Sequence, residues 1–186
     1  YALPDAPRFV HLATYLLPVR MRGEPAPGAP YWFRVHAYFD LTDGRERVVL
    51  AYGPHEAPAP LVRVQHESLL ERFPLATGAV HKPLWHETVR RMVGHGAGYA
   101  AFVPLAGFAP GLGEPMVDDD GGGALLAPHL RDRTAHVLPD AAPAPPGATS
   151  RDGAATMLAL RGLGVAVDAA APLRRAEIGS LRPEPA

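Results

Sequence analysis

The sequence predicts an α/β protein in which a mixed β-sheet is flanked by helices. Residues 61–64 are rich in β-prone apolar side chains, whereas residues 84–93 carry apolar side chains at helical spacing. Residues 99–105 form a short apolar run bounded by predicted helices, which is typical of a strand covered on both faces of its sheet. Strands and helices that follow one another in this way indicate helices layered on a sheet.

The N-terminal part of the chain precedes this core. Residues 9–19 mix β-branched, aromatic and leucine side chains without clean alternation, and Pro18 interrupts them. We expect an extended segment that either covers an edge of the sheet or pairs with a second copy in a dimer. Residues 20–30 are charged and rich in glycine and proline, so they are expected to form a linker.

A β-hairpin is predicted next. Residues 31–39 alternate well enough to form a strand, and residues 48–51 form its partner. The turn between them contains Asp43 and Gly44, a pair that readily adopts the positive φ of a tight turn. A loop over residues 53–60 then leads into the strand that begins at Leu61.

The helix predicted over residues 84–93 is followed by glycines from Gly94 to Gly98, which are typical of a helix C-terminus. Residues 110–123 are predicted to form a loop that contains Asp118, Asp119 and Asp120. Three consecutive carboxylates repel one another, so a solvated loop is favoured over a metal site.

The C-terminal part supplies one more helix and strand. Residues 154–163 are predicted to be helical, with Ser150 or Asp152 as the N-cap and Gly164 ending the helix. Residues 165–167 then form a last strand. A proline- and alanine-rich insertion at about residues 138–148 precedes this helix.

Length and composition limit the possible functions. A chain of 186 residues suits one domain, which we place at residues 28–180, after an N-terminal extension (1–27) and before a short tail (181–186). A net charge of −1 provides no basic surface for nucleic acid or anionic lipid. The absence of cysteine excludes disulfides, thiolate zinc sites and a cysteine nucleophile. No apolar run is long enough to span a membrane, so a cytoplasmic location is the default expectation.

The central motif resembles a known family. Residues 63–69 read Arg-Val-Gln-His-Glu-Ser-Leu, which is similar to the Arg-Val-His-Ser-Glu-Cys-Leu motif of the GTP cyclohydrolase II enzymes of riboflavin synthesis. Other blocks fall in step with the same family over residues 28–176. They include the predicted hairpin, the glycine-rich turn at residues 106–112, and the segment that begins at Ser150. The resemblance implies a GTP cyclohydrolase II-like fold and a homodimer.

The family's zinc ligands are not retained. That family binds a catalytic zinc ion through three cysteine thiolates, and the corresponding positions here are Ser68, Ala79 and His81. The resemblance therefore implies a site without metal or other cofactor. A histidine site that uses His66, His81 and His86 stays open as an alternative, although nothing in their spacing requires it.

The resemblance also supplies roles for individual residues. Arg151 occupies the position of the family's proposed nucleophile on the α-phosphate, but its helper aspartate is Thr149 here. The exchange of the family's arginine for Phe108 makes the pocket more apolar, which favours a small, less charged ligand. The candidate catalytic residues are Glu67, Ser68, His81 and Arg151, and the candidate substrate-binding residues are Arg63, His66, Phe108 and Arg174.

Two functions follow as hypotheses. The first is a repurposed, zinc-independent enzyme on a GTP cyclohydrolase II-like scaffold, acting on a small heterocyclic or nucleotide-like substrate by acid–base chemistry, plausibly in specialised metabolism. The second is a non-catalytic homologue that binds a ligand or a partner. The expected partners are a small-molecule substrate and a second copy of the chain, without nucleic acid or membrane. The remaining histidines are assigned no role: His11, His36, His55, His95, His129 and His136.

Overall fold

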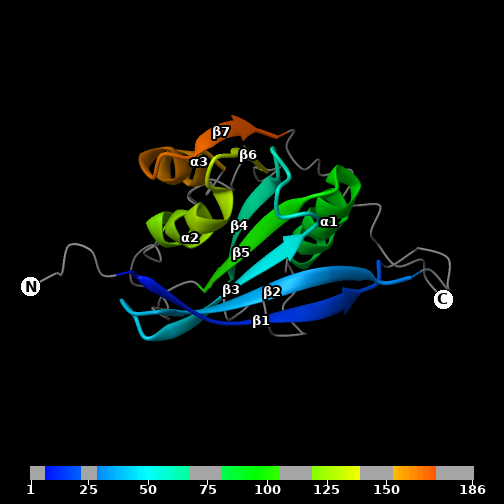
Figure 1. Ribbon diagram of the computed structural model, residues 1–186, viewed down its shortest axis with the longest axis horizontal. Helices are drawn as coiled ribbons and strands as arrows, with labels where there is room; N and C mark the ends of the chain where they lie inside the picture. The colour runs from blue at the N-terminus through cyan, green and yellow to red at the C-terminus, as the bar shows by residue number, and fades with distance from the viewer. Residues whose placement is uncertain (1–6, 22–28, 68–80, 105–118, 139–152, 171–186) are drawn as a thin grey trace, which may run out of the picture.

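The computed structural model describes residues 7–21, 29–67, 81–104, 119–138 and 153–170. Within these residues the fold is α/β, as the sequence predicts, with three α-helices packed on a mixed sheet of seven strands (Figure 1). The insertion predicted at about residues 138–148 lies almost entirely outside the described residues.

The strands lie in the order β1-β2-β3-β5-β4-β6-β7. The first four in this order are antiparallel neighbours, whereas β5, β4, β6 and β7 are parallel to one another. The sheet is therefore a parallel half joined to an antiparallel half. The strands are β1 (Phe9–Val19), β2 (Tyr31–Asp40), β3 (Arg45–Tyr52), β4 (Leu61–Glu67), β5 (Gly98–Pro104), β6 (Thr134–Val137) and β7 (Ala166–Ala169).

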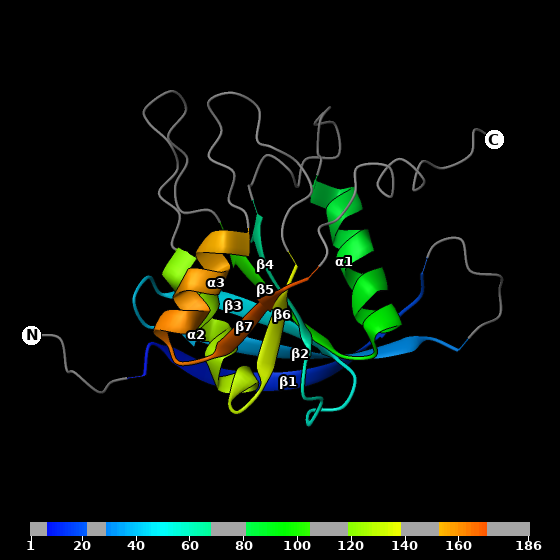
Figure 2. The ribbon, with the colours of Figure 1, turned by 90° about the horizontal axis from the view of Figure 1, so that it is seen from above.

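Helices cover both faces of the parallel half. Helix α1 (His81–His95) lies on one side of the sheet, and α2 (Asp119–Leu126) and α3 (Gly153–Gly162) lie on the other (Figure 2). A short 3₁₀ helix, η2 (Ala127–Leu130), continues from α2. None of the helices in the described residues is both long and apolar enough to cross a membrane.

The two faces of the sheet have separate hydrophobic cores. In β4, Leu61 packs with Val89 and Met92 of α1, whereas Val62 packs with Leu125 of α2 and Leu160 of α3. Side chains of a strand alternate between faces, so β4 is buried on both. The same holds for Ala100 and Ala101 of β5, which confirms the strand covered on both faces that the apolar run predicted.

The predicted hairpin is confirmed as β2 and β3. Gly44 has a φ of 68°, and its backbone N–H donates to the carbonyl of Asp40 at 2.9 Å. Residues 9–19 form β1, which pairs antiparallel with β2 and is the edge strand of the sheet. This confirms the expectation of an extended segment at the sheet edge.

The buried carboxylate of Asp40 in β2 connects the starts of β1 and β3 through hydrogen bonds. Asp40 is fully buried. It accepts two hydrogen bonds, at 3.2 and 3.0 Å, from Arg8, which immediately precedes β1. It also accepts from Arg47 of β3 at 3.3 Å and from the backbone N–H of Thr42 at 2.9 Å. Arg47 pairs with Asp43 in the turn as well. Burial alone would raise the pKa of Asp40, but the hydrogen bonds and the two guanidinium charges outweigh it and hold the pKa below its usual value.

The loop predicted over residues 110–123 is wrong at its end, because Asp119 and Asp120 begin helix α2. The three glycines that indicated a loop lie inside this helix, where close packing explains them. A Cβ atom on Gly122 would lie 2.6 Å from Val64 Cγ1 of β4, and one on Gly123 would lie 2.9 Å from the Cβ of Ala159 in α3. Packing against the sheet and α3 thus offsets the low helix propensity of glycine. Asp118 lies outside the described residues.

Other boundaries differ modestly from the prediction. Helix α1 begins at His81, earlier than expected, and ends at His95, where Gly96 adopts a φ of 90°. Helix α3 and strand β7 lie close to their predicted positions, and Gly164 has the expected positive φ. Strand β6 was not predicted. The N-cap predicted at Ser150 or Asp152 lies outside the described residues.

We expect the Asp40→Ala variant to lose about 3 kcal/mol of unfolding free energy, because among the described residues it leaves the buried guanidinium of Arg47 with the carboxylate of Asp43 alone as an anionic partner. Urea denaturation followed by circular dichroism measures this loss. The matched control is Asp43→Ala, whose carboxylate is about one-third exposed, and it should cost clearly less. Equal losses in the two variants would contradict a central role for Asp40.

Candidate functional site

The parallel half of the sheet has one edge at which all its strands end. Strands β5, β4, β6 and β7 are parallel, so their carboxyl ends lie together. Each of the three α-helices ends shortly before the next parallel strand begins, so the helix N-termini point toward this same edge (Figure 2). Helix N-termini carry a partial positive charge from free backbone N–H groups. The carboxyl edge therefore favours ligands with negative or electron-rich groups.

The connections of the strands diverge at the centre of this edge. Strand β4 leads through α1 to β5 on one side, whereas β6 leads through α3 to β7 on the other side and the other face. Strands β4 and β6 are neighbours in the sheet, and the chain leaves them in opposite directions along it. Open α/β sheets bind ligands at such a switch point, outside the carboxyl ends of the strands.

Two predicted polar positions lie on β4 as it runs toward this point. Arg63 is 3% exposed and Gln65 is 4% exposed. The Nε of Arg63 donates to the Oε1 of Gln65 at 3.0 Å, which confirms that the two side chains share one face of the strand. Since Leu61 packs under α1, alternation places both on the face that α1 covers. The Arg63–Gln65 pair thus places a buried guanidinium on the central strand of the parallel half.

The other predicted site residues are placed only in part. His66 and Glu67 end β4, and His81 begins α1, so their backbones lie at the carboxyl edge. Their side chains lie outside what the structure describes. The structure does not describe Ser68, Phe108, Arg151 or Arg174.

Helix α1 adds polar residues that the sequence analysis did not single out. Thr88 is fully buried and Glu87 nearly so. Glu87 forms ion pairs with Arg90 at 3.1 Å and Arg91 at 3.5 Å. The spacing of these arginines, three and four residues after the glutamate, was the available signal. His86 is exposed on this helix.

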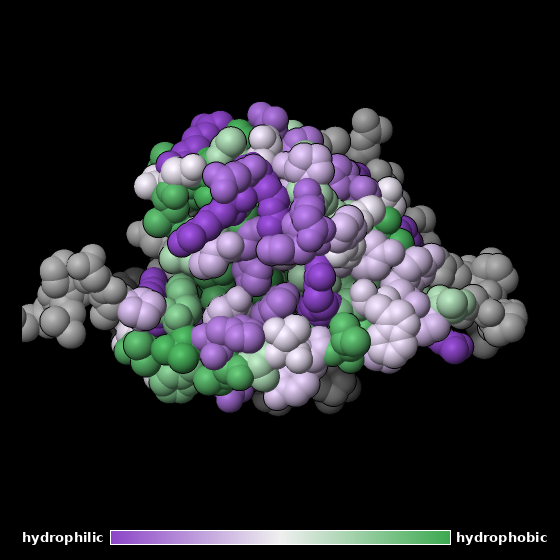
Figure 3. All heavy atoms as spheres, viewed as in Figure 1, coloured by the Kyte–Doolittle hydropathy of each residue, from purple (hydrophilic) through white to green (hydrophobic). Residues whose placement is uncertain are grey.

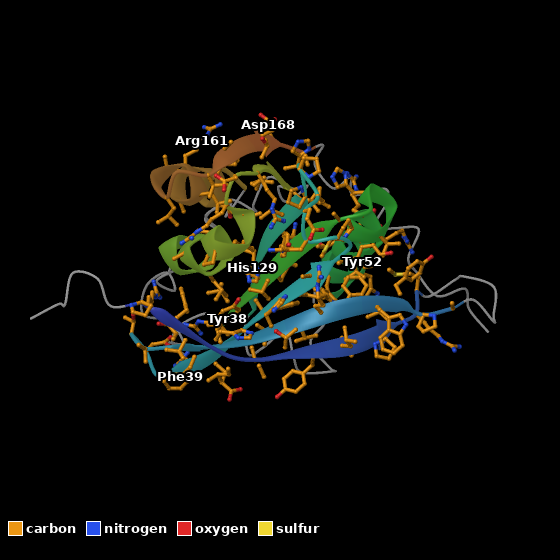
Figure 4. The ribbon with its side chains drawn as sticks, viewed as in Figure 1. Tyr38, Phe39, Tyr52, His129, Arg161 and Asp168 are labelled. Carbon is orange, nitrogen blue, oxygen red and sulfur yellow. The ribbon has the colours of Figure 1, made fainter. Side chains whose placement is uncertain are left out.

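A second polar cluster lies on the opposite side of the sheet, and the sequence analysis assigned its histidines no role. His129 of η2 packs over β2 and β5, where its Nε2 lies 2.7 Å from the hydroxyl of Tyr38 (Figure 4). The ring of His129 also lies 4.8 Å from that of His36 and 5.2 Å from that of Tyr99. His36 and His129, to which the sequence analysis assigned no role, therefore lie in one cluster with Tyr38 and Tyr99.

The cluster continues to the protein surface along β1. The hydroxyl of Thr14 lies 2.9 Å from Nδ1 of His36 and 3.0 Å from Nε2 of His11. A hydroxyl has one proton to donate and lone pairs to accept, so Thr14 links the two imidazoles in a directed chain. This chain runs from exposed His11 to half-buried His36, which stacks near buried His129.

Burial and neighbouring positive charge set the protonation of the cluster. Burial, followed by the charges of His36, His55 and Arg133, lowers the pKa of His129 to about 4. Burial and the charge of Arg34 lower the pKa of His36 as well. Burial raises the pKa of Tyr38, so its phenol stays protonated at neutral pH. The hydroxyl of Tyr38 and Nε2 of neutral His129 share one hydrogen bond, whose direction depends on the imidazole tautomer.

The histidines of this cluster do not form a metal site in the described residues. Among the described residues, no group of three or more histidine, aspartate or glutamate side chains is arranged to hold a metal ion. The alternative site of His66, His81 and His86 falls on side chains that are only partly described.

Comparison with known proteins assigns no family. No protein-family model matches the chain, and no curated protein is significantly similar to it. Its function is therefore argued from the geometry of the described residues.

Protonation of His129 should destabilise the fold at acidic pH. Its pKa is about 4 when folded and near 6.5 when unfolded, so its contribution is complete above pH 6.5 and is lost as the pH falls toward 4. This corresponds to about 3 kcal/mol across that interval. Urea denaturation between pH 4 and 7 measures the slope, which should be shallower in a His129→Gln variant. An unchanged slope in that variant would contradict the assignment.

Proposed function

We propose that the chain is a repurposed, zinc-independent relative of GTP cyclohydrolase II that acts on a small heterocyclic or nucleotide-like substrate at the carboxyl edge. The observation that carries the proposal is the buried Arg63–Gln65 pair on β4, which leads directly to Glu67 at the switch point. This arrangement supplies a fixed cation beneath a position where α/β sheets bind ligands.

The chemistry of the proposal is acid–base catalysis. Glu67 at the end of β4 is the proposed proton acceptor, and His81 at the start of α1 is the proposed proton donor. Their backbones lie at the same edge of the sheet, although a segment of the chain separates them. The N-terminus of α1 provides backbone N–H groups that stabilise negative charge as it develops on the substrate. Ser68, Arg151 and Arg174 complete the proposed site, with His66 and Phe108 against the heterocycle.

Two features of the sequence support the proposed class of substrate and reaction. A motif similar to that of GTP cyclohydrolase II lies on the central strand, at the end of the strand where its polar residues reach the edge. The three positions that would hold zinc in that family lack thiolates, so hydrolysis through a zinc-bound water is not part of the mechanism. We therefore propose a reaction other than that of GTP cyclohydrolase II, and we place it in specialised metabolism.

Arg63→Gln should weaken binding of guanosine monophosphate at least about tenfold, because it removes a charge-assisted contact at the site. Isothermal titration calorimetry with EDTA present measures the affinity, and guanosine monophosphate should bind more tightly than GTP. Arg90→Gln is the matched control, since the side chain of Arg90 is partly exposed on α1 and pairs with Glu87, so its loss should leave affinity unchanged.

Circular dichroism spectra of both variants check that the buried substitution still folds, and Gln65→Leu provides a second test on the same face. The proposal fails if folded Arg63→Gln and Gln65→Leu bind as the unaltered protein does. It also fails if EDTA abolishes binding, because the site is proposed to need no metal.

A second candidate function is partner binding without catalysis, and the surface of β1 favours it. The exposed large hydrophobic residues of the described chain concentrate on this strand, and they lie along the lower edge of the molecule in Figure 3. On β1 they are Val10, Leu12, Tyr15, Leu16 and Leu17, and Trp32 lies beside them on β2. Residues 9–19 also contain no acidic residue or lysine, which commonly protect an edge strand from pairing. We propose that a second copy of the chain covers this surface in a homodimer.

Leu16→Glu should shift the protein from dimer to monomer, because it places a charge in the centre of the apolar edge. Size-exclusion chromatography with light scattering measures the mass. Leu158→Glu is the control, since Leu158 is similarly exposed but lies on α3, away from β1. A dimer that persists in Leu16→Glu, or a monomeric unaltered protein, would contradict the proposed interface.

A further inference from the structure

The polar cluster around His129 differs from the carboxyl edge both in the face of the sheet and in the end of the strands at which it lies. Its residues line the sheet face covered by α2 and η2, whereas Arg63 and Gln65 lie on the face covered by α1. Its outer part is built by the loop before β4 and the turn before β6, which both lie at the amino end of the parallel strands. In Figure 3, polar side chains gather over the middle of this side of the molecule. The carboxyl-edge proposal does not use them.

Arg133 and His55 form the outer part of the cluster above Tyr99. The Nη1 of Arg133 donates to the Tyr99 hydroxyl at 3.1 Å, and its Nη2 lies 3.1 Å from Nδ1 of His55. Nδ1 of His55 in turn lies 3.1 Å from the same hydroxyl. The same Nη2 of Arg133 lies 3.3 Å from Nε2 of His55, so the guanidinium lies against the imidazole of His55. Arg133 thus contacts Tyr99 and His55 and no described carboxylate.

Arg34 is in the same situation on β2. Its Nη2 donates to the backbone carbonyl of Gly53 at 2.6 Å, and its charge lowers the pKa of nearby His36. In the part of the chain that the structure describes, no carboxylate forms an ion pair with Arg34, Arg133 or the four clustered histidines. Glu56 and Asp132 flank the cluster in sequence, but both are exposed and neither is paired with it. The cluster therefore contains two guanidinium cations, Arg34 and Arg133, with which no carboxylate of the described residues is paired.

A cavity adjoins the cluster at Arg133. It has a volume of about 500 Å³ and is lined by the turn from Arg131 to Thr134 and by apolar residues that include Leu130, Leu163 and Val165. Asp132 in this turn has a φ of 59°, a left-handed conformation that is uncommon outside glycine and is best tolerated by aspartate and asparagine. The volume falls within the range of sites that bind small organic molecules.

We propose that this cluster is a second ligand site, which binds the carboxylate or phosphate group of a small organic anion against Arg133 and His55. The adjoining cavity receives the apolar remainder of the ligand. The inference does not rest on the function proposed for the carboxyl edge, because it uses none of the same residues. It gives a role to the donors of the cluster, which lack an anionic partner in the described structure.

Binding at this site should be coupled to protonation. Burial and then the charges of Arg34, His11 and His55 lower the pKa of His36, so an anion bound against His55 offsets part of that field, raises the pKa and takes up a proton. The groups that face His36 are His11 and Thr14 of β1, Arg34 of β2, His55 of the loop before β4, and His129 of η2. Affinity for an anion of constant charge therefore rises as the pH falls, until free His36 is itself protonated.

The test uses inorganic sulfate, whose charge is constant from pH 5 to 8, and acetate at equal ionic strength to distinguish the two headgroup chemistries. Isothermal titration calorimetry should show saturable binding of at least one of them, tightening by up to about tenfold per pH unit for one coupled proton. Titration in two buffers of different ionisation enthalpy should show net proton uptake. Arg133→Gln should abolish binding, and His36→Gln should remove the pH dependence.

Arg45→Gln is the control, because Arg45 is exposed at the start of β3 and belongs neither to the cluster nor to the lining of the cavity. It should retain the affinity of the unaltered protein, and circular dichroism of each variant confirms the fold. The inference is overturned if neither anion binds saturably, if Arg45→Gln and Arg133→Gln lose affinity equally, or if binding takes up no proton. Binding at the carboxyl edge is unaffected by these outcomes, so either proposal can fail without the other.

Discussion

The parallel pairing of β4 between β5 and β6 is the constraint on which the rest of the structure depends. It buries β4 on both faces, so Leu61 and Val62 enter different hydrophobic cores. It also places α1 and α2 on opposite faces, because the β4–α1–β5 and β5–α2–β6 connections move in opposite directions along the sheet and such crossovers are right-handed. Parallel strands need such crossover connections, whereas the antiparallel half is joined by a tight turn. The polar residues at either end of the parallel strands are positioned by this arrangement.

Close packing on β4 explains unusual features of composition. Glycine at positions 122 and 123 allows α2 to approach Val64 and α3, and Gly98 lies where a Cβ atom would be 2.8 Å from the Leu61 carbonyl. Burial of β4 also brings polar groups into the sheet, since Arg63 and Gln65 share its α1 face. A buried polar pair of this kind gives the centre of the sheet a specific chemical character that an apolar strand would lack.

Much of the fold follows from local sequence patterns. The hairpin and its Asp-Gly turn, helix α1 and the apolar strand β5 were predicted because their signals are contained within a few consecutive residues.

Helix α2 was not predicted, because its glycines are favoured by contacts with Val64 and Ala159, which are distant in sequence. Strand β6 was also missed, since only four residues form it and its pairing with β4 and β7 determines it. Arg63 and Gln65 lie on the same face of β4, as the alternation of side chains along a strand requires. The histidine cluster could not be predicted in this way, because His11, His36, His55 and His129 come from four separate segments that only the fold brings together.

The central claim is that a small-molecule ligand binds at the carboxyl ends of the parallel strands. Hydrogen–deuterium exchange with and without saturating guanosine monophosphate tests it most directly, because exchange rates report ligand contact along the backbone. The account predicts slower exchange at the end of β4 and the start of α1, whether or not the turn that contains Arg133 is also protected. Slower exchange confined to that turn, or the absence of any change at β4 and α1 under saturating ligand, would contradict it.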